Sequence, residues 1–173
     1  SPEGSGKDIR LTWAYTDENN HYAMLVVNNL VYVFKRVSGT YTQVGSSGSL
    51  STGLVQGQKY DCRIEWDTTT GDIEVFIDDT SELSVNDTTY TTIGRVGLCT
   101  GNAANKDPIF CYSISVKGDA VTVWSEDWSG ESPWTILESG SIVFAKGVVS
   151  VGGTNYIYVE NRDDDELKMY ALS

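Results

Sequence analysis

The sequence predicts an all-β protein, a two-sheet antiparallel β-sandwich of the jelly-roll type. Apolar and polar residues alternate in many short runs, and turn-forming residues separate these runs, with 17 Gly against only three Pro. Helical periodicity is almost absent, and the runs amount to about 12 to 14 short strands. A chain of 173 residues with 40% hydrophobic residues is suited to one domain with a sizeable core.

The clearest of these runs form a hairpin between residues 58 and 79. One strand places every second residue on an apolar face, the turn 67–71 ends in Gly71, and a second strand resumes the alternation. The apolar positions are Tyr60, Cys62, Ile64, Trp66, Ile73, Val75 and Ile77. Because one face of the hairpin is apolar and the other charged, we expect the apolar face to pack on a second sheet. Trp13, on another alternating run, and Trp66 are expected in the core.

The remaining strands are expected before and after this hairpin in the sequence. The tract 45–53 is expected to be loop with at most a short strand, and 80–92 a long polar connection. The expected strands cover 9–15, 22–27, 30–35, 40–44, 94–99, 109–116, 121–124, 134–137, 141–144, 148–151, 155–160 and 167–172.

The charge of the chain argues against two classes of partner. Lys and Arg total 12 against 24 Asp and Glu, a net charge of -12. Nucleic acids and anionic membranes are bound through clustered Lys and Arg, so we expect no nucleic-acid partner. No apolar run approaches the roughly 18 residues of a membrane helix, so no membrane insertion is expected.

Three cysteines are present without a C-x-x-C motif, which argues against a zinc ribbon or a redox site. Cys62 lies on the apolar face of the hairpin and is expected to act as a small buried hydrophobe. Cys99 and Cys111 lie on two runs expected to form one hairpin, and whether they form a disulfide is left open.

Several motifs together resemble the laminin-G-like, concanavalin-A-like jelly roll. They are I-R-L-T-W, D-E-N-N-H-Y, V-Y-V-F-K-R-V-S-G-T-Y-T, Y-D-C-R-I-E-W, G-D-I-E-V-F-I-D, G-R-V-G-L-C-T and F-C-Y-S-I-S-V, between Asp8 and Lys117. The resemblance covers about two thirds of the chain. It implies a β-sandwich and a binding role at a surface, and it says little about the ligand.

The order of the motifs departs from that family. The segment W-S-E-D-W-S-G-E-S-P-W, followed by F-A-K-G-V-V-S-V, resembles the family's opening segment but lies within 124–151. The chain therefore looks circularly permuted, with a flexible arm at 1–7 and one domain at 8–173. Residues 119–173 are expected to supply the strands that usually come first, either within the chain or to a neighbouring subunit.

The sequence gives little sign of catalysis, and we expect no enzyme. The E-x-D-x-x-E motif of glucanases is absent, and the segment Glu74 to Asp78 does not match it. His21 is the only histidine, and we expect it to be a solvated turn residue rather than a catalytic base. A glycoside hydrolase with carboxylates from different strands remains a distant alternative.

Calcium is the metal that the sequence could accommodate, since it binds carboxylate and carbonyl oxygens in loops and the resembling family often uses it. Asp17 and Asn19 lie in one oxygen-rich turn, and Asp163 and Asp165 would point the same way in another. Neither segment matches an EF-hand loop. A solvated acidic turn is the competing interpretation, and no cofactor is certain.

A glycan is the ligand that the aromatic residues suggest, since aromatic rings stack on sugar C–H groups. The candidates are Trp124, Trp128 and Trp134 around one turn, and Tyr156 and Tyr158 on one strand face. Packing in the core or at its rim is the competing role for these rings.

The expected function is a non-catalytic surface module that binds a glycan or mediates adhesion. The expected location is extracellular, on a cell surface or on a virion surface. The alternative is a self-assembling structural protein, such as a virion decoration or tail protein or an extracellular filament subunit, that forms a homo-oligomer through strand or sandwich contacts.

Overall fold

A computed structural model describes the backbone of residues 8–27, 29–55, 58–100, 109–111, 114–118, 121–126, 135–138, 144–151, 154–161 and 167–171. It describes the side chains of residues 10–27, 29–55 and 58–97. This part of the chain is strand and turn, without a helix of the length and hydropathy that a membrane span requires. The expected arm at 1–7 lies outside the described residues.

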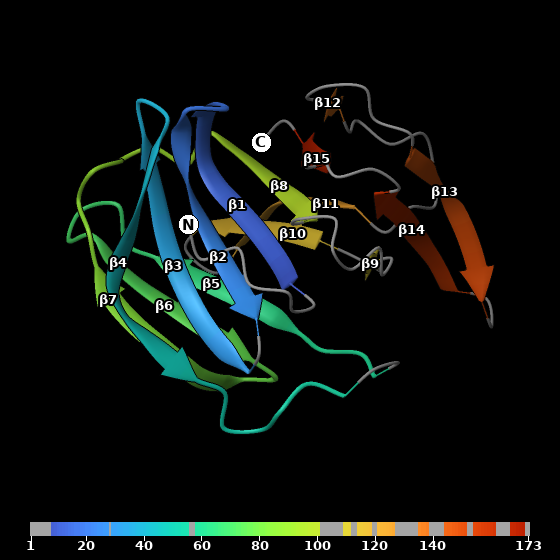
Figure 1. The fold of residues 1–173 in the computed structure, drawn as a ribbon, viewed down its shortest axis with the longest axis horizontal. Coiled ribbons are helices and arrows are strands. Elements are labelled where there is room, and N and C mark those ends of the chain that lie inside the picture. Colours follow the sequence, from blue (N-terminus) through green and yellow to red (C-terminus); the bar gives the residue numbers. More distant parts are fainter. Residues whose placement is uncertain are drawn as a thin grey trace.

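The described strands follow the chain from β1 to β15 (Figure 1). They are β1 (Asp8–Asp17), β2 (Asn20–Val27), β3 (Leu30–Val37), β4 (Thr40–Ser49), β5 (Cys62–Trp66), β6 (Asp72–Ile77), β7 (Thr80–Asn86), β8 (Arg95–Thr100), β9 (Ile109–Cys111), β10 (Ile114–Gly118), β11 (Val121–Glu126), β12 (Thr135–Glu138), β13 (Phe144–Val151), β14 (Thr154–Asn161) and β15 (Leu167–Ala171).

The largest sheet has seven antiparallel strands in the order β12-β15-β8-β1-β2-β3-β4. Its centre is built by consecutive hairpins, because β1 pairs with β2, β2 with β3 and β3 with β4. The turn between β2 and β3 includes Asn29 at a φ of 61°, a conformation that Asn tolerates better than most residues. The tract 45–53, expected to be loop with at most a short strand, continues β4 as far as Ser49.

The predicted central hairpin is confirmed as β5 and β6, and β7 extends it to a three-stranded sheet in the order β5-β6-β7. The prediction of a polar connection at 80–92 was therefore wrong for Thr80–Asn86. This segment forms a strand because Leu83 and Val85 point inward while the intervening Ser84 is exposed. Asp78 and Asp79, both at positive φ, make the tight turn that joins β6 to β7.

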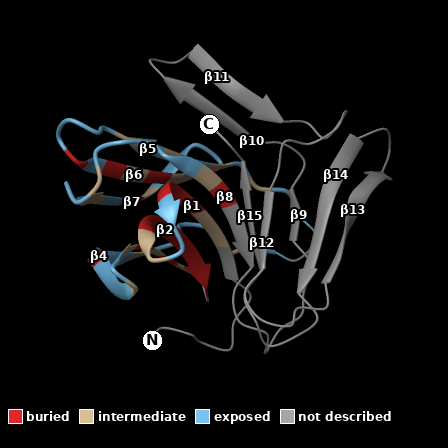
Figure 2. Ribbon diagram, turned by 90° about the horizontal axis from the view of Figure 1, so that it is seen from above, coloured by how far each residue is buried: buried red, intermediate tan, exposed pale blue. Residues whose placement is uncertain are grey.

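The two sheets face each other and enclose the main core (Figure 2). The core contains Trp13, Tyr22, Met24, Val26, Val31, Val33 and Val44 from the large sheet and Ile73, Val75 and Leu83 from the small one. The placement of Trp13 in the core is confirmed, whereas Trp66 is half-buried and packs against the edge of this cluster. The protein is thus an all-β sandwich, as the alternation predicted.

A β-bulge in β1 changes which residues face this core. The register of β1 against β2 shifts between Trp13 and Asp17, and Ala14 has a φ of 51°. As a result, the consecutive residues Trp13 and Ala14 both belong to the core cluster. Tyr15, which simple alternation would place inward, stacks instead on His21 of the opposite face.

The strands after β8 join three different sheets. The strands β12 and β15 extend the large sheet beyond β8, β13-β14-β9 form a second three-stranded sheet, and β10 pairs with β11. The predicted hairpin between the runs of Cys99 and Cys111 was wrong, because β8 pairs with β1 and β15 whereas β9 pairs with β14. The side chains of both cysteines lie outside the described residues.

Candidate binding surface

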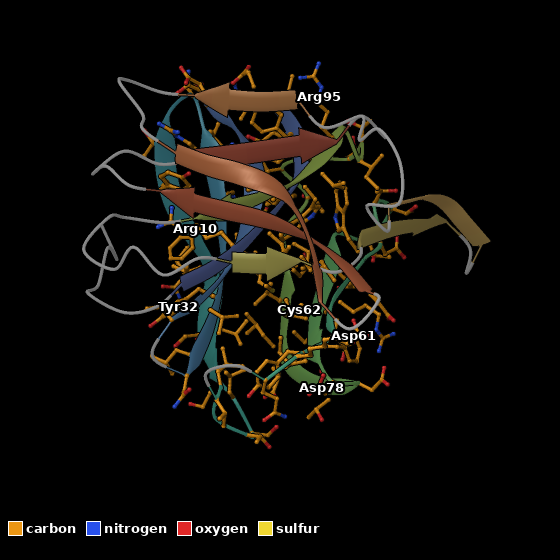
Figure 3. All side chains as sticks on the ribbon, turned by 90° about the vertical axis from the view of Figure 1, so that its right-hand side faces the viewer. Arg10, Tyr32, Asp61, Cys62, Asp78 and Arg95 are labelled. Atoms are coloured by element: carbon orange, nitrogen blue, oxygen red, sulfur yellow. The ribbon has the colours of Figure 1, made fainter. Side chains whose placement is uncertain are left out.

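The face of the large sheet that points away from the small sheet carries a continuous set of rings, which we call the aromatic row. Ala23 pairs with Phe34, and Arg36 pairs with both His21 and Tyr41, so alternate residues of β2, β3 and β4 meet on this face. Successive ring centroids are 5.8 Å apart for Tyr32–Phe34, 6.5 Å for Phe34–Tyr41, 5.8 Å for Tyr41–His21 and 5.7 Å for His21–Tyr15. Figure 3 shows Tyr32 beside the strands of this sheet, with Cys62 on the opposite side of the sandwich.

His21 lies in the middle of the aromatic row and is fully buried, with 0% of its surface exposed. The prediction of a solvated turn residue was therefore wrong. His21 belongs to β2, where Tyr15 stacks on its ring, and its Nε2 atom lies 3.2 Å from the Tyr41 hydroxyl. Its Nδ1 atom lies 3.4 Å from the carbonyl oxygen of Asp17, so both ring nitrogens face polar groups of the fold.

The aromatic row reaches the surface at Tyr41, which is 42% exposed. The guanidinium of Arg36 lies 4.9 Å from the centroid of the Tyr41 ring, a cation–π contact. Arg36 is itself held in place, because its Nε donates to the carbonyl of Gly39 at 3.2 Å and its Nη1 to that of Glu18 at 2.8 Å. The exposed ring is therefore fixed by its neighbours.

The strand β4 places one hydrogen-bonding side chain beside this ring. Thr40, Thr42 and Gln43 are all exposed, but Thr40 and Thr42 point to the opposite face of the sheet. Gln43 lies on the same face as Tyr41, two residues along the strand, and its Nε2 donates to the carbonyl of Gly45 at 3.1 Å. An aromatic ring with an amide beside it is a combination that binds the mixed apolar and polar surface of a sugar.

The turn between β1 and β2 contains the two predicted calcium ligands that the structure describes. The Oδ1 atom of Asp17 accepts hydrogen bonds from the backbone of Asn19 at 2.7 Å and from Nδ2 of Asn20 at 2.9 Å. Its Oδ2 atom accepts from Asn20 Nδ2 at 3.0 Å. In the part of the chain described here, no group of three His, Cys, Asp or Glu side chains is arranged to hold a metal ion. Asp163 and Asp165 lie outside the described residues.

Two carboxylates do meet from different strands on the solvent side of the small sheet. Glu65 of β5 and Glu74 of β6 are directly paired. Glu65 is ion-paired with Arg63, and Glu74 accepts a hydrogen bond from the Ser81 hydroxyl at 2.5 Å. Both carboxylates are therefore engaged with neighbours on an open sheet face.

Cys62 is a free cysteine that is only half-buried in β5. Burial, together with the negative charges of Asp61 and Asp78, raises the pKa of its thiol to about 11. A thiol with this pKa stays protonated at neutral pH and is a poor nucleophile. Its role as a partly buried hydrophobe agrees with the prediction, although its burial is less complete than expected.

The predicted glycan-binding residues fall outside the described side chains. Trp124 belongs to β11, and Tyr156 and Tyr158 belong to β14, two residues apart as predicted for one strand face. Trp128 and Trp134 lie outside the described residues. These five positions therefore remain predictions.

The sequence analysis missed the aromatic row, although part of its signal was present. Tyr32, Phe34 and Arg36 alternate along one strand, which already places two rings and a cation on one face. Their meeting with Tyr41 and His21 depends on the register of three strands, and Tyr15 reaches the row only through the bulge at Ala14.

Comparisons with known proteins give one structural similarity. No protein-family model matches the sequence, and no curated protein matches it. A search of solved structures finds similarity to a carbohydrate-binding module, CBM66 from Bacillus subtilis, with 20% sequence identity and a TM-score of 0.45. The match covers 54% of this chain and 56% of that chain, so the chain spans about half the length of this neighbour. At this level the similarity assigns no ligand, and membership of the laminin-G-like family remains a prediction.

Proposed function

We propose that this protein is a non-catalytic binding module that attaches to a glycan on a cell or particle surface through Tyr41, the exposed ring of the aromatic row. The observation that carries this proposal is Tyr41, an exposed ring of β4 that contacts Arg36 and His21. A sugar ring would place its C–H face on Tyr41 and its hydroxyls near Gln43, on the same face of β4.

The fixed geometry of this surface favours binding. A ring already ordered by its neighbours loses little side-chain entropy when a ligand docks, and preformed surfaces gain affinity for this reason. The Arg36 side chain donates hydrogen bonds to the carbonyls of Gly39 and Glu18, so its position does not depend on a ligand.

The described residues also favour a module without catalysis. His21 is buried against the Tyr41 hydroxyl, and the Cys62 thiol has a pKa raised to about 11, so neither is presented as a nucleophile or base. Glu65 and Glu74 lie on an open sheet face, whereas glycosidases hold their two carboxyl groups on either side of a bound sugar.

The test of this proposal is retention on immobilised polysaccharides by the wild type and the variant Tyr41→Ala. We expect Tyr41→Ala to reduce affinity on the order of tenfold, since stacking of a sugar on one ring contributes about 1 to 2 kcal/mol. Val37→Ala is the matched control, because Val37 is similarly exposed at 40% and belongs to the β3–β4 hairpin but lies outside the aromatic row.

A second arm tests the residues predicted from the sequence. Trp128→Ala is compared with Tyr41→Ala on the same polysaccharide, with the melting temperature measured for each variant. Loss of retention only in Trp128→Ala, with an unchanged melting temperature, would contradict the assignment to Tyr41 and favour the positions predicted from the sequence. Retention by both variants equal to that of the wild type would contradict glycan binding through Tyr41 or Trp128.

A further inference from the structure

The strand β5 lies at one edge of the small sheet. Among the described strands, β5 is hydrogen-bonded only to β6, since the order of the sheet is β5-β6-β7. The opposite edge of this sheet is sheltered, because the backbone of β7 approaches β4 so closely that a Cβ on Gly48 would lie 2.1 Å from the carbonyl oxygen of Glu82. The edge at β5 is thus the one along which this sheet could be extended.

The hydrogen bonds at both ends of the β5–β6 hairpin show which backbone groups point to the open edge. Asp78 N donates to the carbonyl of Asp61, and Asp67 N donates to that of Asp72, each at 2.9 Å. Because hydrogen-bonded and non-hydrogen-bonded pairs alternate in an antiparallel ladder, the odd-numbered residues of β5 bond to β6. The N–H and C=O groups of Cys62, Ile64 and Trp66 therefore point away from β6, toward the open edge.

The inward side chains of β5 are incompletely buried, as expected for a strand with a neighbour on one side only. Cys62, Ile64 and Trp66 are each half-buried, although their direct partners on β6, which are Ile77, Val75 and Ile73, are buried at 5%, 0% and 0% exposure. The indole Nε1 of Trp66 is buried without a hydrogen-bond partner. A further strand along β5 would cover the apolar side chains that β6 alone leaves half-exposed.

The outward side chains of β5 identify a partner that fits this edge. On the solvent face β5 carries Arg63 and Glu65, one on each side of Ile64. If two β5 strands pair antiparallel about a two-fold axis at Ile64, Arg63 of each copy lies opposite Glu65 of the other copy. The apolar positions match as well, because Ile64 faces Ile64 and Cys62 faces Trp66. The Ile64 backbone groups point to the edge, as the central pair of such a ladder requires.

We propose that β5 is a self-association edge, at which two copies of this protein pair their β5 strands to form one continuous sheet β7-β6-β5-β5-β6-β7. The partner is a second copy because the charge pattern of β5 is complementary to itself in this register. Each Glu65, which faces the like charge of Glu74 within its own sheet, gains an arginine on its other side. The register also sets Asp61 opposite Asp67 of the second copy at each end, and this repulsion together with the shortness of β5 makes the association weak and concentration-dependent.

The experiment is a charge-swap series followed by sedimentation velocity over a concentration series. The wild type is expected to shift from monomer to dimer as its concentration rises. Arg63→Glu sets glutamate opposite glutamate, and Glu65→Arg sets arginine opposite arginine, so each variant alone is expected to dimerise on the order of tenfold more weakly. An equimolar mixture of the two variants restores both opposite-charge pairs, and we expect it to form a heterodimer at concentrations where each variant alone is monomeric.

A control variant and three contrary outcomes separate this interface from its alternatives. The double variant Arg63→Glu/Glu65→Arg has the net charge of the wild type and is expected to dimerise as the wild type does, which controls for damage to the contacts of Arg63 with Asp79 and Phe76. A wild type that stays monomeric at every concentration would overturn the proposal. So would a dimer that is insensitive to the single swaps, or a mixture that fails to associate, because each places the contact elsewhere.

Discussion

The hydroxyl of Tyr22 donates a hydrogen bond to the carboxylate of Asp87 over 2.6 Å, and this contact ties the segment after β7 to the centre of the large sheet. Tyr22 is fully buried in the main core. Lys35 Nζ lies 2.5 Å from the same carboxylate, and the backbone N–H of Thr89 donates to it at 2.8 Å. Tyr90 N in turn donates to the Tyr22 hydroxyl at 3.2 Å, so the segment after β7 contacts Tyr22 at a second point.

The variant Asp87→Asn should lower the free energy of unfolding by about 2 kcal/mol, because Lys35 would keep its charge in a half-buried position without a counter-ion. Urea denaturation measures this change. Asp79→Asn is the control, since Asp79 also faces a basic residue, Arg63, but its side chain is 89% exposed. Its loss should stay within about 0.5 kcal/mol, as is usual for surface pairs. Equal losses in the two variants would contradict the importance of the Tyr22–Asp87 network.

The same carboxylate gives the network a dependence on pH. Burial alone would raise the pKa of Asp87, but the Lys35 ammonium and the hydrogen bonds from Thr89 and Tyr22 lower it to about 2. A group whose pKa is lower in the folded state stabilises the fold above its unfolded pKa of about 3.9, and this stabilisation is lost as the pH falls toward 2. The unfolding free energy of Asp87→Asn should therefore fall less steeply between pH 4 and pH 2 than that of the wild type, and parallel curves would refute this assignment.

Gly71→Ala should destabilise the protein by more than about 1 kcal/mol. Gly71 ends the β5–β6 turn at a φ of 81°, and an added Cβ would lie 2.6 Å from Cγ2 of Thr88 and 2.7 Å from the Asp87 carbonyl oxygen. Gly53→Ala is the matched control. Gly53 lies in an exposed loop, and its nearest contact would be the Asn29 side chain at 3.2 Å. Thermal unfolding of both variants checks the difference, and equal melting temperatures would show that the turn relaxes without cost.

Chelation tests the predicted calcium site. The carboxylate of Asp17 already accepts hydrogen bonds from Asn19 and Asn20, so the turn holds its shape through protein contacts. We therefore expect EDTA to leave the melting temperature within about 1 °C of its value in calcium. A ligand bound only by the folded state stabilises it by RT ln(1 + c/Kd), where c is the free ligand concentration, so a clear fall in melting temperature on chelation would establish a calcium site. Comparison of Asp17→Ala with Asp163→Ala would then locate that site.

The sheets were predictable where one side of a strand is apolar and the other polar. The β5–β6 hairpin shows this pattern, and both its strands and its turn were predicted correctly. The strand β7 escaped prediction because only Leu83 and Val85 point inward within a polar segment, and two apolar positions give too weak a period to distinguish strand from loop.

The candidate surface was less predictable because it depends on contacts across strands. His21 follows two asparagines in the sequence, which suggested a turn, yet the strand β2 already begins at Asn20 and buries the histidine between Tyr15 and Tyr41. Alanine rarely adopts a positive φ, so the alternation of apolar and polar residues could not predict the bulge at Ala14 that redirects Tyr15. The opposite charges of Arg63 and Glu65 were visible in the sequence. The position of β5 at the edge of its sheet, where these charges could face a second copy, was not.

The burial of β2 on both faces has a consequence for folding. From His21 to Val27 every residue of β2 is buried, which gives an apolar stretch of the kind that aggregates when it is exposed in an unfolded chain. Its two partners, β1 and β3, are its neighbours in sequence, each reached through a tight turn. Such local pairings form early because little chain entropy is lost in closing them. The order of the first three strands therefore allows this apolar segment to be covered soon after it is synthesised.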